Sequence, residues 1–109
     1  MTENEKPKED IPTEETSTED QTPMPEMRTE DALRFAIGLF TDLAWVQLGI
    51  RANQGGETVI DLQQAKLAID AIAVLVVLTE GRFEAHEVRD LKNLLTSLQM
   101  NFVQRKTAM

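Results

Sequence analysis

Residues 61–78 read DLQQAKLAIDAIAVLVVL, and this stretch decides the fold class. Asp61 is a favourable N-cap residue, and Gln64, three positions later, completes the capping-box pattern of a helix start. Residues 71–78 include no polar residue, and their valines and isoleucine would also suit a strand. The cap, the alanines and the uninterrupted length favour a helix over about residues 61–80. Gly81 then supplies the left-handed residue that commonly ends a helix.

Two further helices are expected, one on each side of this stretch. The first covers about residues 30–48, with Thr29 as its cap and the acidic Glu30 and Asp31 at the positive end of its dipole. The last covers about residues 84–106 and has the apolar spacing of a heptad seam. The seam consists of Val88, Leu91, Leu95, Leu98 and Phe102. Because the links are short and the helices similar in length, we expect an all-α, three-helix antiparallel bundle.

The charge of the chain is concentrated before the first expected helix. The sequence has 109 residues and a net charge of −8. Residues 1–28 hold nine acidic and three basic residues, a net charge of −6, together with all four prolines. Such a segment buries too little apolar surface to offset the entropy of ordering it. We expect a disordered acidic tail over residues 1–28 and a helical domain over 29–109. The tail is interpreted as a solubilising leader, with docking to a basic partner as the alternative.

The composition argues against several kinds of chemistry. The chain has no cysteine, so it forms neither disulfides nor thiolate metal sites. Its single histidine, His86, falls on the first turn of the last helix and cannot make a multi-histidine centre or a plausible Ser-His-acid arrangement. An acidic surface repels phosphate backbones, which argues against nucleic-acid binding. We therefore expect no catalytic residue, no cofactor and no metal ion.

Two carboxylates interrupt apolar stretches, Asp42 in the first helix and Asp70 in the second. If they met, they could share a proton or a cation. A structural role is favoured, because Asp42 falls on a narrow polar stripe and Asp70 lies one turn from Lys66, with which it can pair. A carboxylate metal-binding bundle is kept as a remote alternative.

The folded part carries more apolar surface than three helices can hide among themselves. Residues 29–109 include 41 apolar residues, and the first two helices are apolar over most of their circumference. Soluble monomers rarely expose apolar patches larger than a few hundred Å². Self-association is therefore the leading expectation, most simply as a symmetric dimer. An obligate subunit of a larger complex, bound to an unidentified protein partner, and peripheral attachment to a membrane are the alternatives.

Membrane insertion is disfavoured, because Arg34, Asp42 and Gln47 interrupt the first helix and Asp70 the second. The apolar residues of these helices are expected in the core or at an interface. The positions we single out are Phe35, Leu39, Leu43, Trp45, Val46, Ile72 and Val76.

Several short motifs resemble a bacterial family known as domain of unknown function 1844. They include Gln47-Leu48-Gly49 at a helix end, the loop Gly55-Gly56-Glu57, and Asp61-Leu62-Gln63-Gln64-Ala65-Lys66 followed by Ile69-Asp70. The resemblance covers about residues 33–103 and implies a small, helical, cytoplasmic bacterial protein. A cytoplasmic location also agrees with the charged first residues, which have no apolar secretory core. The family supplies no activity, so no functional residue follows from it.

Overall fold

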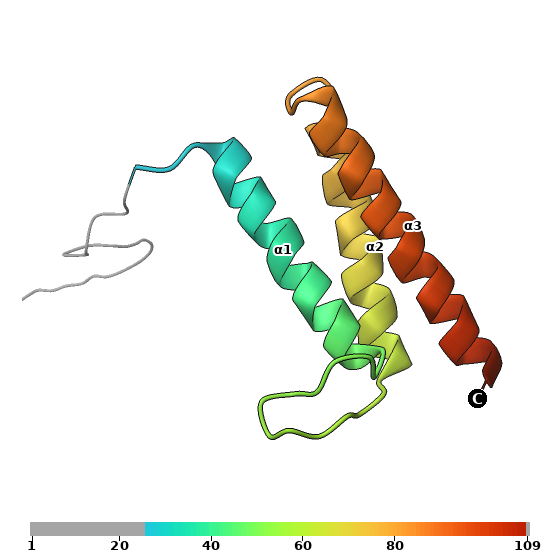
Figure 1. Ribbon diagram of the computed structural model, residues 1–109. Coiled ribbons are helices and arrows are strands. Elements are labelled where there is room, and N and C mark those ends of the chain that lie inside the picture. Colours follow the sequence, from blue (N-terminus) through green and yellow to red (C-terminus); the bar gives the residue numbers. More distant parts are fainter. Residues whose placement is uncertain (1–25, 109) are drawn as a thin grey trace, which may run out of the picture.

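Three helices make up the part of the chain that the structure describes, residues 26–108 (Figure 1). The computed structural model has α1 at Thr29–Gln47, α2 at Leu62–Thr79 and α3 at Ala85–Ala108. The predicted all-α class is therefore confirmed, and each helix begins and ends within two residues of its expected range. The expected tail falls on residues 1–28, of which 1–25 lie outside the described part.

The central helix is α2, which packs against both α1 and α3. α1 and α3 run in the same direction and α2 runs opposite to them, so both neighbouring pairs are antiparallel (Figure 1). Burial of their inner apolar side chains forms one core. Its buried members are Ile37, Ala44, Leu48, Ala65, Ala68, Ile69, Ile72, Val76 and Leu98. Since five of these nine residues belong to α2, this helix supplies most of the core.

The end of α1 is built around a glycine. Gly49 has a φ of 78°, in the left-handed region that favours glycine. Its N–H donates to the Val46 carbonyl at 3.0 Å, and the Ile50 N–H donates to the Trp45 carbonyl at 3.0 Å. These two bonds make a Schellman motif, which satisfies carbonyls that the end of a helix would otherwise leave free.

The loop between α1 and α2 is closed at its base and braced at its tip. Leu48 and Ile60 form an isolated antiparallel bridge at the base. At the tip, the side-chain carbonyl of Asn53 accepts the backbone N–H groups of Gly55 and Glu57, at 2.9 and 3.0 Å. The loop therefore fixes the start of α2 relative to the end of α1.

Asp61 caps α2 as the sequence predicts, because its carboxylate accepts the Gln64 N–H at 3.1 Å. The return half of the capping box does not form. The Asp61 N–H donates instead to the Gln47 carbonyl at 2.8 Å, which ties the start of α2 to the last residue of α1.

The prediction that Thr29 caps α1 is wrong. Thr29 is the first residue of the helix, and Arg28 occupies the cap position without a side-chain hydrogen bond that caps the helix. The reason is that the Arg28 carbonyl already accepts the N–H groups of Asp31 and Ala32, which places Thr29 inside the first turn.

The turn after α2 uses Gly81, whose φ of 81° agrees with the predicted left-handed residue. Glu80 before it is extended, and the Arg82 N–H donates to the Thr79 carbonyl at 3.0 Å, which is the pattern of a type II turn. Thr79 itself is buried, and its hydroxyl donates to the Val76 carbonyl at 2.7 Å. The turn therefore leads into α3 without leaving this buried hydroxyl unpaired.

Candidate functional site

One face of α2 is apolar and is not covered by the other helices. The α2 stripe, defined here as Leu67, Ala71, Val74 and Leu78, follows spacings of four, three and four residues. Leu67 is 65% exposed and Val74 is 64% exposed, with the half-buried Ala71 between them. Because successive helical residues turn by about 100°, the stripe lies opposite the buried Val76. It therefore points away from the core.

A second apolar face lies on α1. The α1 stripe, defined here as Phe35, Leu39 and Leu43, repeats every fourth residue, and Phe35 is 72% exposed. The buried residues Ile37 and Ala44 lie on the opposite side of the same helix. The described part of the chain thus leaves two of its helices with an uncovered apolar stripe.

The structure separates the seven positions that the sequence singles out. Ile72 and Val76 lie in the core, and Trp45 packs against it. Val46 is half-buried. The three residues of the α1 stripe are exposed, so they are not core residues of this chain. Their place at an interface stays a prediction.

The charges beside the two stripes are paired within the chain. Arg51 donates to the Asp42 carboxylate at 3.1 Å, and Lys66 donates to the Asp70 carboxylate at 2.7 Å. Each carboxylate therefore bonds its own cation rather than sharing a site with the other. His86 is exposed at the start of α3. Within residues 26–108, no group of three or more acidic, histidine or cysteine side chains could hold a metal ion.

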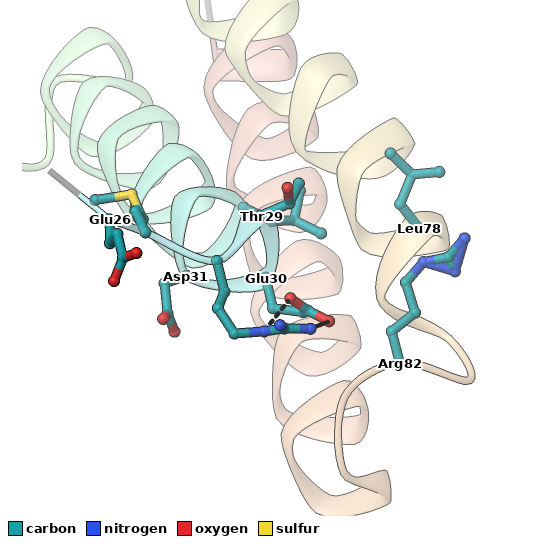
Figure 2. Close-up of a pocket in the computed structure, with 9 residues that line it drawn as sticks. Glu26, Thr29, Glu30, Asp31, Leu78 and Arg82 are labelled. Carbon is teal, nitrogen blue, oxygen red and sulfur yellow. Dashed lines mark hydrogen bonds and ion pairs between the residues drawn. The ribbon is translucent and has the colours of Figure 1, made fainter. Parts of the chain in front are cut away.

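A groove of about 1130 Å³ opens between the start of α1 and the end of α2 (Figure 2). Its lining includes Met27, Leu33 and Leu78 together with Arg28, Glu30 and Arg82. The Nε of Arg28 lies 3.3 Å from the Glu30 carboxylate, so charges of opposite sign offset each other there. Leu78 also belongs to the α2 stripe, and the groove is therefore a recess at one end of that apolar face.

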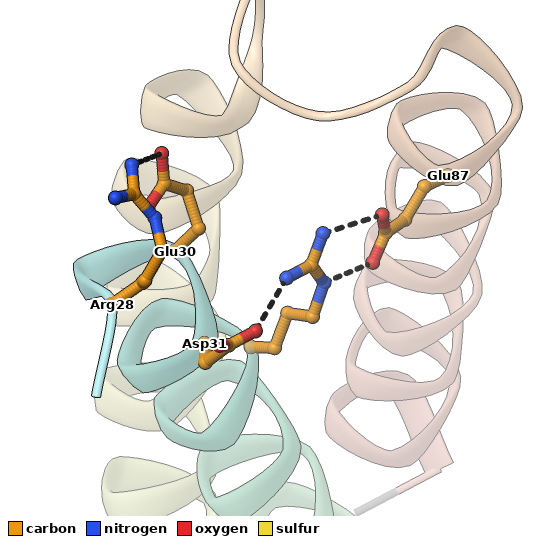
Figure 3. Close-up of polar contacts among 5 residues, drawn as sticks. Arg28, Glu30, Asp31 and Glu87 are labelled. Atoms are coloured by element: carbon orange, nitrogen blue, oxygen red, sulfur yellow. Dashed lines mark hydrogen bonds and ion pairs between the residues drawn. The ribbon is translucent and has the colours of Figure 1, made fainter. Parts of the chain in front are cut away.

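Arg34 in α1 bonds Glu87 near the start of α3, and Figure 3 shows Glu87 and Asp31 on either side of the guanidinium that binds them. Its Nε and Nη2 donate to the two carboxylate oxygens of Glu87 at 2.7 and 3.1 Å, a bidentate pair. Its Nη1 donates to Asp31 at 2.9 Å, and its guanidinium carbon lies 4.2 Å from the centroid of the Phe83 ring. Sequence spacing does not reveal this contact, because Arg34 and Glu87 are 53 residues apart.

The hydrogen bond from Arg34 holds the pKa of the Glu87 carboxyl below its usual value. Such a carboxyl contributes stability above its unfolded-state pKa, and this contribution is lost as the pH falls through the lowered folded-state pKa. Arg34→Gln is therefore expected to lower the melting temperature at about pH 7, and the difference from wild type is expected to shrink at about pH 2. Thermal melts followed by circular dichroism at both pH values measure the change.

Arg89→Gln is the matched control for this prediction. It removes the pair of Arg89 with Asp90 in α3, whose two side chains are both well exposed, and such pairs contribute little to stability. A difference for Arg34→Gln that is the same at both pH values would contradict a role for the ionised Glu87.

Over residues 26–108 these features define a small three-helix bundle with uncovered apolar faces and no group of side chains that could hold a metal ion. Residues 32–104, which are 73 of the 109, match the model of the family described as "Domain of unknown function (DUF1844)", and the chain belongs to this family. The resemblance in the motifs is thereby confirmed. Neither a curated protein nor a solved structure is significantly similar to the chain.

Proposed function

We propose that the chain is a non-enzymatic interaction module of the bacterial cytoplasm that associates with itself through the exposed faces of α1 and α2, most simply as a symmetric dimer. The observation that carries the proposal is the exposure of the two apolar stripes. Burying a large apolar side chain contributes about 1.5–3 kcal/mol relative to leaving it in water. Covering both stripes therefore gives a strong driving force for association.

The distribution of charge supports pairing of two copies. Most of the net charge of −8 lies in residues 1–28, and residues 29–109 carry a net charge of only −2. The acidic groups beside the stripes are already paired with Arg51 and Lys66. Two helical domains can therefore approach along these faces with little repulsion between like charges.

A membrane surface is the second candidate partner, and one observation favours it. By length and composition alone, α2 is apolar enough to cross a membrane, and 33% of it is buried within the bundle. Against this, the chain is acidic and would be repelled by anionic lipid. Asp70 within the helix also disfavours insertion.

Light scattering on the eluate of a size-exclusion column tests self-association, because it gives a mass that does not depend on shape. The expected mass is about 25 kDa, twice the 12.3 kDa of one chain. Phe35→Glu in the α1 stripe should shift the protein towards the monomer, whereas Ser97→Glu on the exposed side of α3 should not. A wild-type mass of 12.3 kDa at all concentrations would overturn the proposal.

Co-sedimentation with lipid vesicles separates the two candidate partners. The wild-type chain is expected to stay in the supernatant with both neutral and anionic vesicles, because its apolar faces are covered by a second copy. A chain that is monomeric in solution and pellets with neutral vesicles would favour the membrane instead.

A further inference from the structure

The central helix, α2, is the one with the most apolar surface to bury. Between Asp70 and Thr79, α2 has no polar residue on any side. α1 and α3 pack on two of its sides, and the α2 stripe, with the exposed Val77 beside it, remains uncovered. A helix that is hydrophobic all round is normally buried all round. α1 differs, because Arg34 and Asp42 give it polar positions suited to water.

We propose that the α2 stripe of one copy packs antiparallel against the α2 stripe of a second copy; this inference rests on the self-association proposed above. The spacings of four, three and four residues are those of a coiled-coil seam. A two-fold axis places the stripe of one copy against the same stripe of the second copy, with the two helices running in opposite directions. Leu67 then faces Leu78 of the second copy, and Ala71 faces Val74 of the second copy. The small Ala71 lets the two helices approach closely near the axis.

The charges at the end of α2 fit an antiparallel pair better than a parallel one. α2 has no basic residue in its last turn, so the partial negative charge of its final carbonyls is not offset there. In the antiparallel register, Lys66 of the second copy, which also bonds Asp70 of its own chain, comes level with Thr79, the last residue of α2. A parallel pair would instead bring two negative helix ends together.

Because the chain has no cysteine of its own, this register can be tested directly with introduced cysteines. A disulfide requires Cα atoms about 4.4–6.8 Å apart. Full-length Ala71→Cys and Val74→Cys chains are mixed under mild oxidation, and several-fold more disulfide-linked dimer is expected from the mixture than from either chain alone. The same result is expected when Leu67→Cys is mixed with Leu78→Cys. Ser97→Cys in α3 is the control and should give only background linkage.

The outcomes distinguish this inference from the proposed function. Linkage of each variant to itself in preference to the mixture would overturn the antiparallel arrangement. A dimeric mass with no linkage at any of the four positions would overturn the α2 contact and leave self-association standing. A monomeric mass would overturn both.

A charge variant provides a second test that does not depend on disulfide geometry. Because Val74 is 64% exposed in the single chain, Val74→Glu is expected to keep the wild-type helix content by circular dichroism. Its mass by light scattering is expected to fall to that of one chain. A folded Val74→Glu that is still fully dimeric would overturn the placement of Val74 at the contact.

Discussion

Replacing Ile72 by alanine is expected to lower the free energy of unfolding by about 2–5 kcal/mol. The Ile72 side chain is 0% exposed in the middle of α2, the helix that supplies most of the core. Truncation removes apolar contacts and leaves a cavity, because the surrounding helices relax only in part. Urea denaturation followed by circular dichroism measures the loss, provided that wild type and variant are compared in the same oligomeric state.

Val74→Ala is the matched control, because Val74 lies two residues further along the same helix on its uncovered side. At a protein concentration low enough to keep the chain monomeric, its expected cost is below about 1 kcal/mol. At higher concentration the cost should grow, since association stabilises the folded state by mass action and Val74 lies at the proposed contact. Equal losses for the two variants in the monomer would contradict the burial pattern of α2.

The parts of the fold that sequence reasoning predicts are those fixed by short-range bonds. The start of α2 depends on Asp61 and Gln64, three residues apart, and their hydrogen bond forms as predicted. At the start of α1, the same kind of reasoning misplaces the cap by one residue. An N-cap residue needs an extended backbone, and it is Arg28, with φ of −76° and ψ of 146°, that has one, so the cap lies one residue before Thr29.

The candidate site is less accessible to sequence reasoning, because it depends on which faces the neighbouring helices cover. Periodicity places Phe35 and Ile37 on different sides of α1, but both are apolar, and the pattern does not say which side meets α2. The structure buries Ile37 and exposes Phe35. The contact of Arg34 with Glu87 cannot be predicted from the sequence for a similar reason. It forms only when α1 and α3 have both packed on α2.

Gly49→Ala is expected to lower the free energy of unfolding by about 2–5 kcal/mol, from two separate effects. An alanine at the φ of 78° that Gly49 adopts costs about 1–2 kcal/mol relative to glycine. Its Cβ would also lie 2.6 Å from Cγ1 of Ile60, and displacing packed atoms typically costs about 1–3 kcal/mol. Because Ile60 bridges to Leu48 at the base of the loop, that displacement also strains the connection between α1 and α2.

Two other glycines separate these effects. Gly56 has a φ of 81° but nothing within 4 Å of an added Cβ, so Gly56→Ala should show the backbone cost alone, about 1–2 kcal/mol. Gly38 lies within α1, has neither a positive φ nor a close neighbour, and its replacement by alanine should stabilise the protein by about 0.5–1 kcal/mol. Chemical denaturation should therefore rank the variants Gly38→Ala, Gly56→Ala and Gly49→Ala in falling stability. Equal losses at Gly49 and Gly56 would show that Ile60 moves aside freely, and the end of α1 would then depend on glycine only for its backbone conformation.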